Sequence, residues 1–252
     1  MIQVGNLLAV NLLTAIIFLP LLGAVVVMLL PRGDKNLARW VALGFSLAVF
    51  LLSLKVFLDY DRAAGGFQFE EQADWFSLLG ASWHVGVDGI SAVMILLTGL
   101  LVPLGVLISF EIERQVNLYM ALFLFLETGL MGVFAALDMM FFFVFWEVGL
   151  VPMYFLINIW GGDDRIYASV KFFIYTMAGS LGLLLAIQLI GLTAGTMDIV
   201  RLTEFWPAFN GNDGVFLGVS IDTVKWLAFL AFFLAFSIKV PVWPFHTWLP
   251  DA

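Results

Sequence analysis

Four ionisable residues lie inside long apolar segments of this sequence: Glu127, Glu147, Lys171 and Lys239. Glu147 is the most isolated of them, because the run FFFVFWEVGLVPMYFLI around it contains no other charged residue. A carboxylate at mid-depth in a bilayer costs roughly 2.5–3.5 kcal/mol on insertion scales, so such a group is expected to have a function and a partner. Carboxylates and lysines in hydrocarbon are suited to proton transfer.

Lys239 is the natural countercharge for Glu147. It lies in the run FSIKVPVWPFHTWLP, where Pro241 and Pro244 follow it closely. Proline lacks a backbone donor and clashes with the preceding turn, so the helix is predicted to break or kink just past Lys239. Transporters place ion sites at such breaks, and a desolvated lysine can exchange protons. We predict a proton-relay pair; the alternative is an inert buried ion pair that holds two helices together.

Three further residues are candidates for the same polar path. Glu127 and Glu147 lie about ten residues to either side of the turn between their segments. At 1.5 Å per residue both are predicted near mid-membrane, where they share a proton if they face one another. The alternative is that one of them faces a polar pocket and stays protonated. Lys171 either joins the path or extends to the headgroups. His246 follows Lys239 at i+7, and the two residues lie on one face only if the helix between them is unbroken.

The elements that position these residues are predicted to be transmembrane helices. The chain is 63% hydrophobic and 12% charged, about half the charge of a typical soluble domain. Windows near twenty residues with almost no charge are typical of membrane-spanning helices. We predict an all-α polytopic membrane protein with a single transmembrane domain over residues 1–252. Its seven expected spans are 7–30, 38–58, 88–110, 117–137, 139–160, 167–192 and 224–245.

The distribution of basic residues predicts the orientation. The loops 31–39, 111–116 and 161–166 carry Lys and Arg, whereas the loops on the other side are mainly acidic. The positive-inside rule places the basic loops in the cytoplasm and the N-terminus on the outer face of the cell inner (plasma) membrane. The 59–87 linker becomes amphipathic toward its end and is expected to lie in the membrane interface.

Several kinds of chemistry are excluded or disfavoured. The chain has no cysteine, which removes disulfides, iron–sulfur ligation and thiol chemistry. Only His84 and His246 could ligate a haem, and His84 is expected in a polar loop. The sequence contains no Gly-rich phosphate loop, no metal-spaced cluster and no nucleophile–base pair. The net charge of −8 argues against nucleic acid as a partner. No cofactor or metal is expected in this chain.

Three stretches are distinctive: DMMFFFVFWEVGLVPMYFLINIWG, SVKFFIYTMAGSLGLL and FSIKVPVWPFHTWLPDA. They closely resemble the antiporter-like, proton-pumping membrane subunits of respiratory complex I, of the NADH-quinone oxidoreductase subunit M (chain 4) type. The stretch GVDGIS before the third span fits the same family. Together the motifs run through most of residues 84–252.

The resemblance implies proton translocation as a subunit of an NADH:quinone oxidoreductase, a translocase, with no redox chemistry in this chain. NADH, FMN, iron–sulfur clusters and quinone are expected in partner subunits; other membrane subunits, protons and the lipid bilayer are the expected partners. The resemblance also implies that Glu147 is a principal proton-path residue and that Lys239 is its partner. Lys171 is implied to lie on the same polar axis, and His246 matches the histidine of PFHTWLPDA. Glu127 matches a glutamate of some members only.

The family has about fourteen helices in two inverted-topology halves, whereas this sequence ends at Ala252, the last residue of LPDA. The resemblance therefore implies the first half of a 14-helix antiporter-like fold, with helix 7 broken at Pro241 and Pro244, and an N-terminal fragment. Two alternatives stay open. One is a subunit of a multi-subunit cation/proton antiporter or a membrane-bound hydrogenase, which share these motifs. The other is a structural membrane spacer with an inert buried ion pair.

Overall fold

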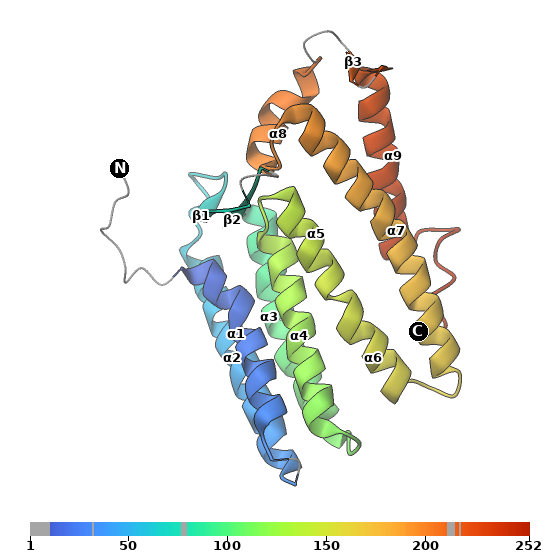
Figure 1. The fold of residues 1–252 in the computed structure, drawn as a ribbon. Helices are drawn as coiled ribbons and strands as arrows, with labels where there is room; N and C mark the ends of the chain where they lie inside the picture. The colour runs from blue at the N-terminus through green and yellow to red at the C-terminus, as the bar shows by residue number, and fades with distance from the viewer. Residues whose placement is uncertain (1–10, 32, 77–79, 211–214, 217) are drawn as a thin grey trace. The chain divides into compact units, whose positions relative to one another are not determined.

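The computed structural model describes residues 11–252 except 32, 77–79, 211–214 and 217. In this part of the chain, seven helical segments are long and apolar enough to cross a membrane. Figure 1 shows that helices make up most of the fold. The predicted all-α polytopic architecture is confirmed, and the chain is a multi-pass membrane protein. Contacts divide it into two compact units, and the single-domain organisation stays a prediction.

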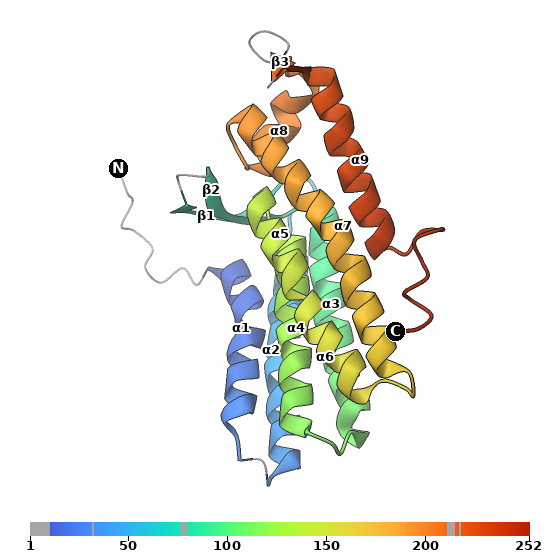
Figure 2. The ribbon, with the colours of Figure 1, turned by 45° about the vertical axis from the view of Figure 1, so that its right-hand side comes forward.

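The first unit contains the described residues of 1–72 and 84–136. Its helices α1 to α4 pack on one another (Figures 1 and 2). They are α1 (Leu12–Leu29), α2 (Lys35–Asp59), α3 (Gly89–Ile108) and α4 (Val116–Ala135). A single 3-10 turn, Ser109–Glu111, follows α3. The core between these helices is apolar, with many small residues: Ala24, Val27, Ala38, Ala42, Leu43, Val102, Val106, Val116, Met120, Ala121 and Leu124.

The second unit contains the described residues of 73–83 and 137–252. Its helices are α5 (Met139–Val148), α6 (Leu150–Trp160), α7 (Arg165–Ala194), α8 (Ile199–Phe205) and α9 (Ile221–Lys239). Helix α7 packs along both α6 and α9, and α5 contacts α6 and α7 (Figure 2). A 3-10 turn, Trp206–Ala208, follows α8. The antiparallel strands β3 (Val215–Phe216) and β4 (Val219–Ser220) precede α9.

Several helices begin at an acidic or hydroxyl residue whose side chain accepts the first free N–H groups. Asp88 accepts from the N–H groups of Ile90 (3.0 Å) and Ser91 (2.7 Å), and its own N–H donates to Ser91 Oγ (2.7 Å). Burial raises the pKa of Asp88, but these hydrogen bonds outweigh burial, so the pKa lies below its usual value. The same type of cap begins α2, α5, α8 and α9, at Asp34, Asp138, Asp198 and Ser220. Such caps stabilise a helix by about 1 kcal/mol each.

Two predicted spans differ from the observed helices. The span 139–160 is divided at Gly149 into α5 and α6. The span 224–245 is helical only to Lys239, because the prolines that follow cannot continue the backbone hydrogen bonding. Positions 7–10 of the first predicted span lie outside the described residues.

The 59–87 linker, expected as an amphipathic interfacial stretch, contains the strands β1 (Gln68–Phe76) and β2 (Ala81–Val87). They form a two-stranded sheet. In β2 the apolar residues Ala81, Trp83, Val85 and Val87 alternate with polar or small residues, which favours a pleated strand over a helix. The linker prediction missed this periodicity of two.

Candidate proton-transfer site

Glu147 lies in the last turn of α5, where the helical path is interrupted. Gly149 separates α5 from α6, and its N–H donates to the carbonyl oxygen of Glu147. Pro152, the third residue of α6, has no N–H to donate to the carbonyl of Val148, four residues before it. Glu147 therefore lies beside a backbone carbonyl that lacks its usual helical donor.

Lys239 is the last residue of α9, so the break predicted at Pro241 and Pro244 is confirmed. Beyond Lys239 the chain folds back, and Trp248 Nε1 donates to the carbonyl oxygen of Ile238 at 2.9 Å. The Trp248 side chain is buried. This contact satisfies a carbonyl that the helix itself leaves without a donor, and it anchors the chain directly after Lys239.

Glu147 and Lys239 lie in the same unit and attract one another electrostatically. They form no direct ion pair among the described residues. Instead, Lys239 Nζ lies over the ring of Trp146, 5.2 Å from its centroid. Trp146 directly precedes Glu147, so both partners of the lysine come from the end of α5. The site places a carboxylate and an amine in one unit, both half-buried, without a direct bond between them among the described residues.

Lys171 and His246 lie in the same unit but have other contacts. Lys171 Nζ forms an ion pair with Asp251 Oδ2 at 2.6 Å and lies 5.5 Å from the centroid of the Tyr167 ring. His246 is half-buried, and its Nδ1 is buried without a hydrogen-bond partner in the described part of the chain. Neither residue is in direct contact with Glu147 there, so their place on the polar path stays a prediction.

Glu127 belongs to the other unit. Its side chain on α4 is 0% exposed, and neither carboxylate oxygen has a hydrogen-bond partner among the described residues. Helices α1 and α3, which pack against α4, contain no ionisable residue, and those of α2 lie near its two ends. A buried carboxylate with neither a donor nor a countercharge is costly. Because Glu127 and Glu147 belong to different units, their sharing of a proton stays a prediction.

Asp138 determines where α5 begins. It is fully buried, and its Oδ1 accepts from the N–H groups of Met140 (2.9 Å) and Phe141 (3.2 Å). Its Oδ2 accepts from the N–H of Ser82 at 3.0 Å. Burial raises the pKa of Asp138, and the backbone donors offset this only in part. The helix that carries Glu147 therefore has a fixed start and an interrupted end.

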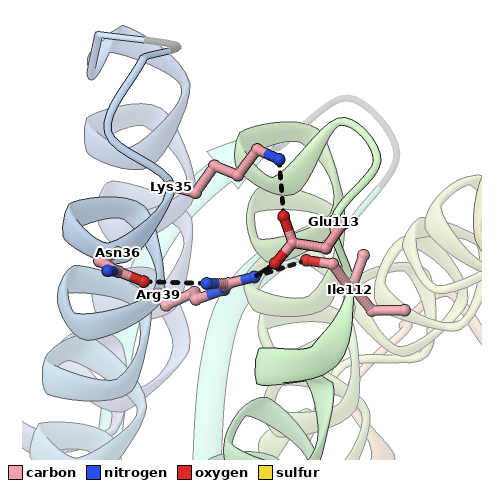
Figure 3. Close-up of polar contacts among 5 residues, drawn as sticks. All are labelled: Lys35, Asn36, Arg39, Ile112 and Glu113. Atoms are coloured by element: carbon pink, nitrogen blue, oxygen red, sulfur yellow. Dashed lines mark hydrogen bonds and ion pairs between the residues drawn. The ribbon is translucent and has the colours of Figure 1, made fainter.

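A separate charged cluster in the first unit is shown in Figure 3. Lys35 Nζ and Arg39 Nη2 contact the two carboxylate oxygens of Glu113 at 2.6 and 2.7 Å. Arg39 also donates from Nη1 to Asn36 Oδ1 and from Nη2 to the carbonyl oxygen of Ile112, both at 2.9 Å. The two cations lower the pKa of Glu113 to about 2. The cluster joins α2 to the loop before α4.

Among the residues with described positions, no group of three or more His, Asp or Glu is arranged to hold a metal ion. The expected loop position of His84 is wrong, because His84 lies in strand β2 and is buried. Its Nε2 lies 3.2 Å from Glu70 Oε2. This histidine is therefore engaged with a carboxylate.

The segment that carries this site is similar to known membrane proteins. Residues 136–252, which carry α5 to α9, match the transmembrane family described as NADH:quinone oxidoreductase/Mrp antiporter. The antiporter family match thus includes Glu147, Lys171, Lys239 and His246, whereas Glu127 lies before it.

Relatives of this family extend the similarity over nearly the whole chain. The chain is 46% identical to NADH-quinone oxidoreductase subunit M of Rhodobacter capsulatus, over 96% of this chain and 48% of the relative. A chain of respiratory complex I from Thermus thermophilus has a TM-score of 0.78 and 30% identity, over 95% of this chain and 46% of that one. A chain of the archaeal membrane-bound sulfane sulfur reductase shares the fold, with a TM-score of 0.79 and 22% identity, over 96% of this chain and 47% of that one.

The expected resemblance to the complex I subunit M type is therefore confirmed. The chain spans about half the length of the curated relatives it matches.

The charges within apolar segments predicted Glu147 and Lys239, but two features beside them were not predicted. Trp146 was not predicted as a neighbour of Lys239, although tryptophan is the ring that binds cations best. The interruption of the helix at Gly149 was also missed. Its signal was available, since Gly149 and Pro152 are helix breakers close to an intramembrane acid.

Proposed function

We propose that this chain takes part in proton translocation as a membrane subunit of an NADH-quinone oxidoreductase. One observation carries the proposal: Glu147 and Lys239 lie in one unit, each at the end of a helix that is interrupted within an apolar segment. The similarity to subunit M of Rhodobacter capsulatus supports the choice of assembly. Electron transfer, with NADH, FMN, iron–sulfur clusters and quinone, belongs to partner subunits.

In this proposal the coupling is electrostatic. Charge movement in the assembly changes the field at Glu147 and Lys239, and with it the free energy of each protonation state. Glu147 takes up a proton when the attraction of Lys239 weakens, and it releases the proton when the ammonium returns. Lys171 and His246 continue the route. Glu127, buried without a partner, holds a proton as a neutral acid.

The same proposal includes the location of the protein. We place it in the cell inner (plasma) membrane with the N-terminus on the outer face, because the basic residues concentrate in alternate short loops. The cluster of Lys35, Arg39 and Glu113 joins two segments of that predicted cytoplasmic side.

The test is Glu147→Gln in the intact complex, reconstituted in vesicles. With NADH and quinone supplied, we expect proton uptake to be lost while the complex stays assembled, because the amide cannot exchange a proton. Proton uptake is followed with a pH-sensitive dye and assembly by native electrophoresis. Glu204→Gln, at an exposed position of α8, is the control and is expected to pump normally. Full pumping by Glu147→Gln would overturn the proposal.

A second candidate is a subunit of a multi-subunit cation/proton antiporter. The description of the matching family, which includes the Mrp antiporter, favours it. Sodium-dependent proton transport by the purified assembly, without NADH or quinone, would select this candidate over the first.

A further inference from the structure

The ammonium of Lys239 has a neighbour that the proton route described above does not use, the ring of Trp146. Nζ lies 5.2 Å from the ring centroid, within the distance of about 6 Å at which a cation is attracted to the face of an aromatic ring. Both side chains are half-buried, and the attraction is stronger where water is excluded. It acts on the ammonium and not on the neutral amine, so the ring distinguishes the two protonation states of Lys239.

The Trp146 ring is held in place by contacts from three helices. Its Nε1 donates to the buried Ser180 Oγ on α7 at 3.3 Å. Phe142 on α5 lies beside it, with centroids 5.6 Å apart, and Phe236 on α9 makes an edge contact at 5.5 Å. Because these contacts fix both the position and the tilt of the ring, its face is already oriented toward Lys239.

We propose that Trp146 is a positioning residue that holds the protonated Lys239 through its ring face, as an alternative partner to Glu147. The inference rests on the proposed function. Trp146 and Glu147 are consecutive, so the ammonium has a π face and a carboxylate available from one turn of α5. When Glu147 becomes neutral, the ring still stabilises the ammonium. Lys239 therefore keeps its proton after the charge of its acidic partner has gone.

Other charges around Lys239 do not account for this stabilisation. The titratable groups on the elements around α9 are Glu147, Tyr154, Arg165, Tyr167, Lys171, Tyr175, Arg201, Glu204, His246 and Asp251, and α9 itself carries Asp222 and Lys225. Of these, Glu147 is the group that acts electrostatically on Lys239. Lys171 and Asp251 are paired with one another. The effect of the Trp146 ring on Lys239 can thus be separated from the effect of one acidic group, Glu147.

The experiment measures proton pumping as a function of pH in the intact complex, with tetrafluorotryptophan placed at position 146. Fluorination keeps the shape of the ring and removes the negative charge of its face. We expect the alkaline limb of the pumping profile to move to lower pH by about 0.4–1.5 pH units. Trp146→Leu should move it in the same direction, and Trp146→Phe by less. An unmoved limb in the fluorinated protein overturns the inference, including when Trp146→Leu does not assemble.

A matched control lies at the other end of the same helix. Lys225 Nζ lies 5.8 Å from the centroid of the Trp206 ring, and tetrafluorotryptophan at position 206 should leave the profile unchanged. An equal shift from position 206 would overturn the inference. Glu147→Gln is measured in parallel. If it pumps normally, the proposed function fails; if it stops pumping while fluorination at position 146 has no effect, only the inference about Trp146 fails.

Discussion

Lys171 Nζ and Asp251 Oδ2 are 2.6 Å apart, so the early part of α7 is ion-paired with the segment that follows α9. Asp251→Asn removes this charge and keeps the size of the side chain. Because both groups are partly exposed, we expect only a small loss of stability. Proton pumping should fall more clearly, since Lys171 loses the acid that holds it. Asp222→Asn, at the exposed start of α9, is the control. Unchanged pumping in Asp251→Asn would contradict the hypothesis that Lys171 needs its ion pair with Asp251 to take part in proton transfer.

A double replacement separates a proton-relay role of Glu147 and Lys239 from a purely structural one. The inert ion pair expected as the alternative is not formed directly among the described residues. In Glu147→Gln with Lys239→Met, both charges are removed at similar side-chain volume. Removal of both members of a buried pair is often close to neutral for stability, whereas removal of one leaves an uncompensated charge. We expect the double variant to assemble as well as the wild type but to pump no protons. Coupled pumping at the wild-type rate would support the structural spacer instead. Melting temperature and dye-detected proton uptake provide the two measurements.

Close packing of α7 on α9 at Gly179 gives a further prediction. A Cβ added at Gly179 would lie 3.0 Å from Ile238 Cδ1 and 3.3 Å from its Cβ. Gly179→Ala therefore displaces the residue next to Lys239, and overpacking of this kind costs about 1–3 kcal/mol. We expect reduced pumping, with partial rescue by Ile238→Val, which removes the Cδ1 atom. Gly182→Ala is the control, because its nearest contact is the Ala231 carbonyl oxygen at 3.9 Å. No rescue in the double variant would exclude this contact as the cause.

Removal of the Asp138 carboxylate should destabilise the start of α5. Asp138→Ala loses the helix cap, about 1 kcal/mol, and leaves the Ser82 N–H without its acceptor, about 1–3 kcal/mol. We expect a total of about 2–4 kcal/mol, with a smaller loss for Asp138→Asn, which retains one acceptor oxygen. Asp34→Ala is the matched control, because in the described part of the chain this exposed side chain caps α2 through the Leu37 N–H alone. Equal losses at both positions, measured by thermal unfolding in detergent, would contradict the additional role of the Ser82 contact.

The Glu113 cluster predicts a pH dependence of stability in acid. Lys35 and Arg39 lower the pKa of Glu113 from 4.5 to about 2 in the folded protein. The stabilisation from this carboxylate is therefore complete above about 4.5 and is lost as the pH falls from 4.5 to about 2. Glu113→Gln should be less stable than the wild type at neutral pH, and the difference should shrink across this window. The neighbouring Glu111→Gln, at an exposed position, should show no such change. A constant difference between pH 4.5 and about 2 would exclude the ion pairs as its source.

The membrane-spanning segments were predictable because the signal is local and strong. Long apolar windows must be helical in hydrocarbon, where every backbone group needs a partner in its own segment. The end of α9 at Lys239 was predictable for the same reason, since two prolines follow it. The division at Gly149 had a weaker signal, because a helix can also continue past a single proline with a kink.

The contacts that the buried charged residues make were harder to predict from the sequence. Lys171 and Asp251 are 80 positions apart, and their pairing depends on how the chain folds back after α9. Spacing along the chain indicates the depth of a residue in the bilayer but not which side of its helix faces a neighbour. For this reason Lys239 was matched with Glu147 by charge, whereas its contact with the Trp146 ring depended on the packing of α5, α7 and α9.

The sequence by itself determined the type of protein, a helical membrane protein. It also determined which ionisable residues lie in apolar segments: Glu127, Glu147, Lys171 and Lys239. Composition and hydrophobic windows are sufficient for this, because a charged residue within a long apolar window is visible in the sequence without knowledge of the fold. Only the tertiary structure decided what each charge contacts. Lys239 lies against Trp146, Lys171 pairs with Asp251, and Glu127 is buried without a partner among the described residues. Such contacts depend on the rotation and close approach of helices distant in sequence, which local patterns do not specify.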